Sequence, residues 1–593
     1  MNGNGRNMYV FRDGRRSVTG PSLVEALAAR VQKLAQTSPL DAGSRNLIID
    51  VLLGAGELEC ALADTGSPEA GRVAALTDIA ASLLTETMDG CPSFAPRFSA
   101  LTWEQDLLAL LPQHPPATLH LSPPEGFAYY ALHPLDFADL ALQASVPRGR
   151  ALVVGIRSIG VMLSAVARAA LLKRGIHAER LTVRPIGHPY DRRTEFNFRQ
   201  LEQIANARAH ESEFLVVDEG PGMSGSSFLS VGEALLSAGV ARSRVQFLCS
   251  RQPDVSALCA RDAARRWDSF RVLCAAPATH LPAGARIYIG GGYWRHELIG
   301  HDPRQWPASW SQMERLKFLS PDRRTLFKFE GFGRFGAAVH QRAQVLAEAG
   351  YATLPLGSLE GFGMYPFAEG SPMRPADLAP DVVQLMAGYC AFRVRAFRCD
   401  GIAGAPHLSD VGRCGSSHDN VAQLETMLRF NLAEEFDFHL NGDLGSLAAA
   451  NPVIVDGRML PHEWIRARDD RLLKADATSH GDDHFFPGPA TDICWDLAGA
   501  IVEWEMPPGA VKAFLAHYRS TSGDDPRSRL PAYLLAYTVF RMAYCKMAAS
   551  AMAGSNEEPR LLAAYRYYRQ RVAAFLPEFA PQSSPDNSLL AAD

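Results

Sequence analysis

The sequence lacks any long uncharged apolar run, and its cysteines have no regular spacing. No segment approaches the roughly twenty uncharged residues that span a bilayer, and residues 1–6 lack the apolar core of a signal peptide. The 10 cysteines include no CxxC pair, which argues against a disulfide framework and against a zinc knuckle. We therefore expect a protein of the reducing cytoplasm that has no membrane partner.

Neither sign of charge dominates the sequence. There are 59 Lys and Arg against 64 Asp and Glu, a formal net charge of −5, which gives no reason to expect nonspecific nucleic-acid binding. The hydrophobic share of 47% and the charged share of 21% are typical of globular proteins. Small molecules are the expected partners, and a homodimer is compatible with the sequence.

Local composition predicts an α/β multidomain protein. Val24, Leu27, Val31 and Leu34 lie at helical spacing early in the chain, and five prolines between residues 112 and 124 mark a boundary. We place a helical N-terminal region at 1–117, a parallel-sheet unit at 118–305, a two-lobed unit at 311–576 and a mobile tail at 577–593.

The strongest chemical signal lies in residues 214–228, where four apolar residues precede two acids and then glycines and hydroxyls. The apolar residues predict the end of a central parallel strand, which puts Asp218 and Glu219 at the edge where open α/β sheets bind ligands. The loop after them can bring backbone N–H groups and hydroxyls against a phosphate at a helix N-terminus. Because adjacent carboxylates repel a phosphate, they need ribose hydroxyls or a metal as partner.

This stretch resembles the diphosphoribosyl-binding signature of the type I phosphoribosyltransferases. The resemblance implies that Asp218 and Glu219 are catalytic and hold the ribose hydroxyls of phosphoribosyl diphosphate as positive charge develops on the ring. The linker at residues 220–223 departs from the family, which carries aliphatic residues there. The loop residues implied to bind phosphoribosyl diphosphate are Gly222, Ser224, Gly225, Ser226 and Ser227.

Upstream segments support the same resemblance. Residues 151–160 read as an apolar strand entering a short turn, and in the family this first strand and loop hold the pyrophosphate, so Arg157, Ser158 and Gly160 are candidates. Residues 187–193 resemble the mobile hood that closes over phosphoribosyl diphosphate. Arg192 is the candidate there, because arginine suits bidentate phosphate contacts.

The second half carries a different pattern. Residues 324–330 predict a strand with a single lysine, Lys328, inside an apolar alternation, and a helix over 340–349 and a strand near 361–370 follow. This order resembles the small lobe and hinge of the aminoglycoside phosphotransferase and choline kinase group. The resemblance implies that Lys328 binds the phosphates of ATP and that Glu348 or a neighbour on the helix holds the lysine.

Three later segments resemble the large lobe of the same kinases, at residues 459–465, 472–476 and 488–498. The resemblance implies that Glu463 and Asp476 are metal ligands, since two oxygen ligands on adjacent loops can hold Mg2+ against nucleotide phosphates. Asp496 at the head of a helix is expected to cap that helix and to brace the catalytic loop.

The catalytic base of the kinase-like unit stays open. The family's His-Gly-Asp motif is replaced by Asp456-Gly-Arg458, whereas Asn441-Gly-Asp443 is more similar but lies too early in the chain. The candidates for the base are therefore Asp443 and Asp456, and the choice of Asp443 makes Asn451 the metal-side residue. An added His480-Gly-Asp-Asp-His484 could ligate a metal or meet substrate, but a polar loop is the favoured interpretation.

Together these patterns predict a fused enzyme with two sites. A phosphoribosyltransferase-like domain would transfer phosphoribosyl from phosphoribosyl diphosphate to an unknown acceptor with Mg2+, and a kinase-like α+β domain would use ATP. The alternative is a regulatory protein in which a nucleotide-sensing phosphoribosyltransferase fold is joined to a pseudokinase scaffold. The direction of the ribosyl reaction and both acceptors stay open.

Overall fold

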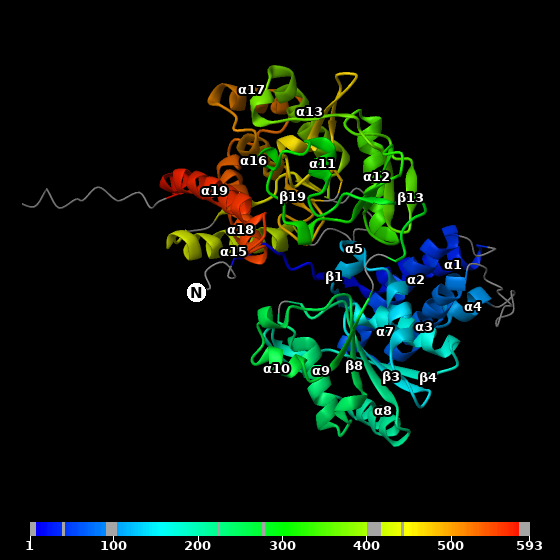
Figure 1. Ribbon diagram of the computed structural model, residues 1–593. Coiled ribbons are helices and arrows are strands. Elements are labelled where there is room, and N and C mark those ends of the chain that lie inside the picture. Colours follow the sequence, from blue (N-terminus) through cyan, green and yellow to red (C-terminus); the bar gives the residue numbers. More distant parts are fainter. Residues whose placement is uncertain are drawn as a thin grey trace, which may run out of the picture.

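The computed structural model describes residues 8–37, 42–89, 103–222, 224–275, 279–399, 417–440, 444–478 and 480–579. It is a mixed α/β protein whose two halves lie one above the other in Figure 1, with the short helix α5 (Glu125–Ala128) between them. The first three residues of the expected tail, 577–579, belong to the last helix, and from residue 580 onwards the tail lies outside the described residues. No helix in the described ranges has the length and apolar character needed to cross a membrane.

The N-terminal region is mainly helical and packs on the parallel sheet. Thr19 caps the first helix, because its Oγ1 accepts the N–H of Ser22, and Leu27, Val31 and Leu34 are buried on one face of that helix. A two-stranded ribbon of β1 (Arg16–Thr19) and β2 (Thr118–Leu121) ties the region to the sheet unit. The helices are α1 (Gly20–Ala35), α2 (Ala42–Asp64), α3 (Ala70–Glu86) and α4 (Trp103–Leu108).

Five parallel strands form the sheet of the first half, in the order β4-β3-β7-β8-β9. Apolar residues alternate between its faces: Ala151 and Val153 of β3 pack toward α2 and α7, and Leu152 and Val154 pack on the opposite face. Both faces are covered, which explains the continuous apolar runs in these strands. The strands are β3 (Arg150–Ile156), β4 (His177–Val183), β7 (Glu213–Val217), β8 (Val245–Cys249) and β9 (Arg271–Cys274).

Helices and one hairpin complete this half. The helices are α6 (Pro134–Gln143), α7 (Gly160–Lys173), α8 (Phe198–Ala209), α9 (Ser226–Ser237) and α10 (Ala263–Trp267). The segment expected to be a hood is an antiparallel hairpin of β5 (Ile186–His188) and β6 (Asp191–Arg193). The central position of β7 agrees with the strand that the sequence predicts before Asp218.

The small lobe of the second half is an antiparallel sheet in the order β10-β11-β12-β14-β13. Lys328 lies on β12, the helix α12 follows, and β13 and β14 come next, which is the order that the sequence indicates. The sequence interpretation put the strand near residue 287 in the first unit, but β10 pairs with β11 and so belongs to the small lobe. The elements are β10 (Ile287–Tyr288), α11 (Trp294–Leu298), β11 (Lys317–Leu319), β12 (Thr325–Phe329), α12 (Arg334–Glu348), β13 (Gly357–Leu359) and β14 (Phe362–Pro366).

The large lobe is mostly helical, with short strands that carry the candidate site loops. The helices are α13 (Pro380–Ala396), α15 (Ser417–Phe436), α16 (Cys494–Glu503), α17 (Pro508–Ser522), α18 (Leu530–Ala551) and α19 (Glu558–Phe579). The strands are β15 (Gly370–Pro372), β16 (Pro452–Val453), β17 (Trp464–Ala467), β18 (Leu472–Lys474) and β19 (Thr491–Asp492).

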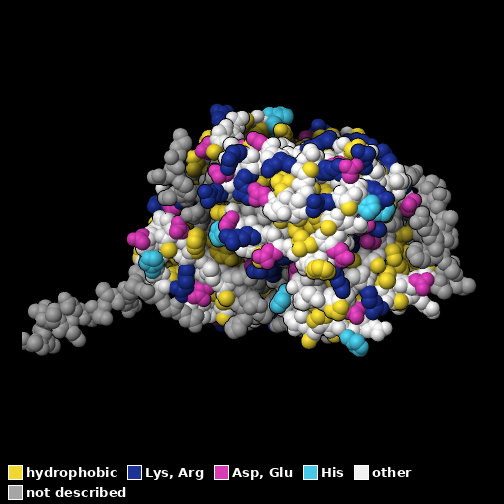
Figure 2. Space-filling model, turned by 90° about the horizontal axis from the view of Figure 1, so that it is seen from below, with side chains coloured by type: hydrophobic (Ala, Val, Ile, Leu, Met, Phe, Trp, Pro, Cys, Tyr) yellow, Lys and Arg dark blue, Asp and Glu magenta, His cyan; other side chains and the backbone are white. Residues whose placement is uncertain are grey.

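The two halves share their cores. Met8 and Val10 are buried in the large-lobe core, although they precede the first helix. Phe327 and Phe329 of the small lobe belong to the same apolar cluster as α2 and α7. On the face seen in Figure 2, side chains of both charge signs are interspersed, as the nearly balanced composition predicts. Each half therefore contributes residues to an apolar cluster that lies mainly in the other half.

Candidate functional site

Asp218 and Glu219 directly follow β7, between the carboxyl ends of β3 and β8. Oδ1 of Asp218 accepts the N–H of Glu219 at 2.9 Å. Burial raises the pKa of Asp218 to about 7, against the guanidinium of Arg184. Burial, followed by the nearby carboxylates of Glu125 and Asp218, raises the pKa of Glu219 to about 8. This pair therefore favours a ligand that brings positive charge or hydrogen-bond donors.

The loop after the two acids meets the hairpin that was expected to be a hood. The hydroxyls of Ser224 and Ser226 donate to the carbonyl of Pro189, at 2.8 and 2.6 Å. Gly225 has φ +71°, which favours glycine, and α9 begins at the next residue. Gly222, Ser224 and Gly225 thus lie between the acid pair and α9, and Ser226 and Ser227 are the first two residues of that helix.

The upstream candidates make contacts that the sequence did not indicate. Arg157 forms an ion pair with Asp64 of α2 at 3.0 Å and donates to the carbonyl of Thr182. Gly160 begins α7, and a Cβ at this position would lie 2.6 Å from the carbonyl oxygen of Val217, so glycine allows α7 to approach β7. Ser158 lies in the turn between β3 and α7.

Arg192, the candidate in the hairpin, donates to the carbonyl of Gly187 at 2.8 Å. This contact is local to the hairpin and leaves the side chain exposed. The phosphate-binding roles of Arg157, Ser158, Gly160 and Arg192 stay predictions.

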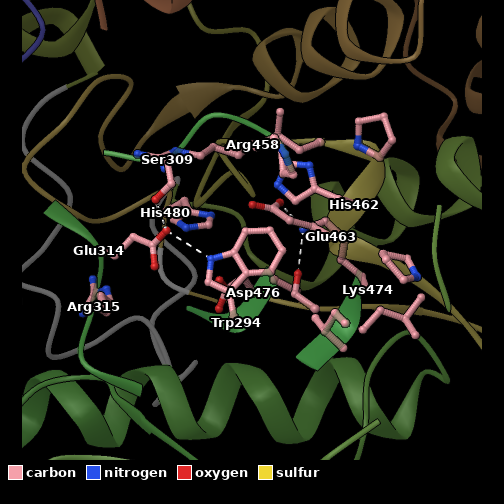
Figure 3. Close-up of a pocket in the computed structure, with 18 of the residues that line it drawn as sticks. Trp294, Ser309, Glu314, Arg315, Arg458, His462, Glu463, Lys474, Asp476 and His480 are labelled. Atoms are coloured by element: carbon pink, nitrogen blue, oxygen red, sulfur yellow. Dashed lines mark hydrogen bonds and ion pairs between the residues drawn. The ribbon is translucent and has the colours of Figure 1, made fainter. Parts of the chain in front are cut away.

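A cavity of about 1080 Å³ lies between the small and large lobes. Its wall includes Lys328, Glu463 and Asp476, the three residues that the kinase resemblance assigned to ATP and metal. Figure 3 shows Glu463 and Asp476 on this wall, with the indole of Trp294 projecting into the cavity. The structure therefore brings together three candidate residues from different segments of the chain.

Two lysines converge on Asp476. Lys317 and Lys328 are directly opposite in the ladder of β11 and β12, so their side chains share one face of the sheet. Nζ of Lys328 lies 2.5 Å from Oδ1 of Asp476, and Nζ of Lys317 lies 3.0 Å from Oδ2. Burial would raise the pKa of Asp476, but the two ammonium groups outweigh burial and hold its pKa well below the usual value.

The acid expected to hold Lys328 does not do so. Glu348 is exposed at the end of α12, and Lys328 pairs with Asp476 instead. A different acid, Glu330, directly follows the strand that carries Lys328, has 2% exposure and accepts the hydroxyl of Tyr365 at 2.6 Å. Burial raises the pKa of Glu330, and the charge of Lys328 opposes that shift.

Lys474 occupies the space between two other candidate residues. Its Nζ lies 2.9 Å from Oε2 of Glu463 and 3.3 Å from Oδ2 of Asp456. Ligand atoms of Asp456, Glu463 and His480 lie within 4.8 Å of one another. Carboxylate oxygens suit Mg2+, and Lys474 supplies positive charge to the same carboxylates.

Of the two candidates for the catalytic base, the structure describes only Asp456. Asp443 and its neighbours at 441 and 442 lie outside the described residues. Asp456 has 0% exposure, is absent from the cavity wall, and accepts the hydroxyl of Tyr389 at 2.5 Å. Asn451 is half-buried beside Asp492, whose Oδ2 accepts its N–H.

Asp496 braces the loop, as the sequence predicts. Its two carboxylate oxygens accept the N–H groups of Asp456 and Gly457, at 2.8 and 2.9 Å. The expected capping role falls to another residue, because Oδ1 of Asp492 accepts the N–H of Cys494 at the start of α16. The loop that contains Asp456 is thus fixed by a buried carboxylate.

Three residues of the segment 480–484 line the cavity, namely His480, Asp483 and His484, whereas the sequence favoured a polar loop with no role at a site. Asp483 and His484 each have 6% exposure. Burial holds the pKa of His484 at about 3, so its imidazole is neutral. Nothing in the local composition of this polar segment indicates that other parts of the chain cover it on several sides.

Sequence reasoning also missed part of the cavity wall. Trp294, which was not among the residues predicted for the site, lines the cavity, donates from Nε1 to Glu314 at 3.1 Å and stacks on His462. Arg458 also lines the cavity, and its guanidinium lies 5.1 Å from the ring centroid of Tyr544. The one available signal was the glycine run at 290–292, which directly follows β10.

Comparisons with known proteins give likeness at the level of structure. No family model matches the chain, and no curated protein matches its sequence. Choline kinase LicA from Streptococcus pneumoniae aligns over 44% of this chain and 89% of its own, with 12% identity and a TM-score of 0.28. An ethanolamine kinase from Plasmodium vivax aligns over 45% and 80%, with 12% identity and a TM-score of 0.30.

Macrolide 2'-phosphotransferase MphH from Brachybacterium faecium aligns over 42% of this chain and 88% of its own, with 15% identity and a TM-score of 0.27. At TM-scores near 0.3 these likenesses carry no weight beyond the observation itself. The resemblance of the first half to phosphoribosyltransferases stays a prediction.

Proposed function

We propose that the cavity between the lobes binds a magnesium nucleotide and transfers its terminal phosphoryl group to a small molecule. The observation that carries this proposal is the convergence of Lys317 and Lys328 on Asp476 inside the cavity. Two ammonium groups held side by side repel each other unless an anion lies between them. Asp476 is that anion in the structure, and nucleotide phosphates carry the same kind of charge.

The chemistry of the wall fits this ligand. On phosphate binding, Lys317 and Lys328 can exchange the carboxylate of Asp476 for phosphate oxygens, which frees that carboxylate. Glu463 and Asp476 would then hold Mg2+, which supplies charge neutralisation at the phosphates. Transfer of a phosphoryl group depends mainly on positioning and electrostatic stabilisation, and a buried, lysine-rich wall provides both.

Substitution at Asp476 tests the proposal. Wild-type protein should bind ATP with Mg2+, seen as a rise in melting temperature and as heat in titration calorimetry. Asp476→Ala should lose this binding by at least about tenfold, and the exposed Asp469→Ala serves as the matched control that retains it. Wild-type protein that does not bind ATP with Mg2+ would contradict the proposal.

A second function is favoured by the acid pair at the sheet edge. We propose that Asp218 and Glu219 hold the ribose of phosphoribosyl diphosphate, while the loop at 220–227 and the N-terminus of α9 hold its phosphate. The support is positional: two half-buried acids follow the central strand β7 and precede a glycine- and serine-rich loop that opens α9. Negative charge beside a developing oxocarbenium favours the transition state.

The test is release of pyrophosphate from phosphoribosyl diphosphate with Mg2+ and a pool of metabolite acceptors. Asp218→Asn with Glu219→Gln should abolish release, because the change removes charge and keeps side-chain volume. Binding without release in the wild-type protein would favour the alternative, a nucleotide-sensing regulatory protein with a pseudokinase scaffold.

A further inference from the structure

The expected position of the kinase base does not hold a base. The third residue of the family motif is Arg458, whose guanidinium stays charged because neighbouring carboxylates and Tyr544 raise its pKa despite burial. Asp456, two residues earlier, is enclosed by Tyr389, Lys474 and the N–H of Arg458. A carboxylate that accepts three donors and does not face the cavity cannot reach a substrate hydroxyl.

Another carboxylate does face the cavity. Asp483 lines it and has 6% exposure. Oδ1 of Asp483 accepts the N–H of Phe485 at 2.9 Å, which fixes the orientation of the carboxylate. In the part of the chain that the structure describes, Oδ2 accepts no hydrogen bond. A fixed carboxylate with one oxygen available to the cavity is the arrangement that a general base requires.

Three elements clamp the backbone around Asp483. Arg12 donates from Nε to the carbonyl of Asp483 at 2.9 Å, and the hydroxyl of Tyr129 donates to the carbonyl of Asp482 at 2.9 Å. From the small lobe, Arg342 donates to the carbonyl of Thr478 at 2.9 Å and pairs with Asp482. Contacts from the N-terminal segment, from the end of α5 and from α12 therefore hold the loop against the cavity.

We propose that Asp483 is the general base of the phosphoryl transfer, in place of the aspartate that Arg458 replaces. This inference rests on the proposed kinase function. Oδ2 of Asp483 takes the proton of an acceptor hydroxyl as the hydroxyl oxygen forms a bond to the γ-phosphorus. The bond from that phosphorus to the β–γ bridging oxygen breaks, and its electron pair leaves with ADP. The proton then passes from Asp483 to solvent.

The charged and titratable groups around Asp483 are consistent with this role. Burial raises the pKa of Asp483 to about 6, against the charges of Arg458 and Arg315. Arg12 is a further cation near it, and Tyr129 and Tyr130 face it from the end of α5. Arg458 lies near Asp483 on the cavity wall, so its guanidinium can bind a phosphate oxygen beside the base.

The experiment separates binding from transfer in the full-length protein. Asp483→Asn should bind ATP with Mg2+ within about threefold of wild type, because the lysines and Asp476 are unchanged. It should form ADP at a rate lower by about 10²- to 10⁴-fold, measured with water and with a metabolite extract as phosphoryl acceptors. Asp456→Asn tests the competing assignment of the base to Asp456. Melting temperatures of both variants establish that they fold.

Each outcome decides the assignment. Retained turnover in folded Asp483→Asn overturns it, as does loss of ATP binding in that variant, which would indicate a structural role. Turnover lost in folded Asp456→Asn but kept in Asp483→Asn would assign the base to Asp456. Wild-type protein that binds ATP but forms no ADP with either acceptor overturns the assignment together with the transfer step, whereas absent ATP binding overturns the kinase proposal itself.

Discussion

The hydroxyl of Tyr130 lies 2.7 Å from Nε2 of His484, and this contact joins the two halves beside both candidate sites. Tyr130 follows α5, and Gly126 in α5 lies against the carboxylate of Glu219 at the sheet edge, where an added Cβ would be 3.0 Å from Oε2. On its other side, the same segment lines the cavity through Tyr129 and Tyr130. α5 is thus in contact with the acid pair and with the cavity loop at once.

We therefore predict that the two sites are energetically coupled. Occupancy of the sheet edge by phosphoribosyl diphosphate should change the affinity for ATP with Mg2+ by about fivefold or more, and the reverse effect should be equal. Tyr130→Phe removes the hydroxyl contact with His484 and should abolish most of this change in affinity. Titration calorimetry of each ligand, with and without the other ligand present, measures the change. Identical affinities in the two conditions for the wild-type protein would exclude coupling.

Gly126 provides a second test at the same segment. A Cβ there would lie 2.9 Å from Cδ1 of Ile159 and 3.0 Å from the carboxylate of Glu219. Gly126→Ala should therefore displace Glu219 and weaken binding of phosphoribosyl diphosphate by about tenfold, or roughly 1.4 kcal/mol. Gly71→Ala is the matched control, because nothing lies within 4 Å of its added Cβ. Equal binding by the two variants would show that Glu219 does not depend on this contact.

The acid pair also predicts how stability changes with pH. Burial raises the pKa of Asp218 to about 7 and that of Glu219 to about 8, whereas both pKa values are near 4 in an unfolded chain. The folded protein therefore binds these protons more tightly than the unfolded chain, so its stability falls as pH rises from about 4 to about 8.

Asp218→Asn with Glu219→Gln removes this contribution. The variant should be more stable than wild type near pH 8, by roughly 1–3 kcal/mol after discounting for partial exposure, and similar to it near pH 4. Melting temperatures across this range, without ligand, provide the measurement. A variant that melts below wild type near pH 8 would contradict the burial-driven shifts.

Much of the fold follows from local sequence pattern, and most of the site does not. β7 and its two acids are predictable because a buried strand followed by polar residues is a local signal. The partner of Arg157 is Asp64, and residues 480–484 are covered by Arg12 and Tyr129. These contacts join residues far apart in the chain, and a single sequence carries no record of such tertiary neighbours.

The same limit applies to the expected division at residues 305–311. From the sequence, we end one unit at residue 305 and begin the next at 311, but β10 precedes that point and pairs with β11 after it. Trp310 has 5% exposure and packs on Tyr544 and Phe485 of the large lobe. Composition marks where a chain leaves regular structure, whereas independence depends on which surfaces are buried together.

A fragment ending at Trp310 should therefore fail to fold as a stable unit. Truncation removes β11, the partner of β10, and exposes Met8 and Val10, which the large-lobe core covers in the whole protein. It also leaves Glu57 of α2 without Arg334, its partner in an ion pair whose side chains are 4% and 3% exposed. Loss of one partner of a buried ion pair costs about 3–5 kcal/mol, which is comparable to a large share of the stability of a domain.

Limited proteolysis and a thermal melt of this fragment, beside the full-length protein, provide the measurement. We expect rapid digestion and no cooperative melt for the fragment. Glu57→Gln in the full-length protein is the companion variant, because it removes the same ion pair without truncation, and its melting temperature should fall. A fragment that melts cooperatively and binds phosphoribosyl diphosphate as well as the whole chain would show that the first half folds without the second half.

In that case, the contact of Tyr130 with His484 would join two units that are each stable alone. Any coupling between the two sites would then depend on that contact and its immediate neighbours.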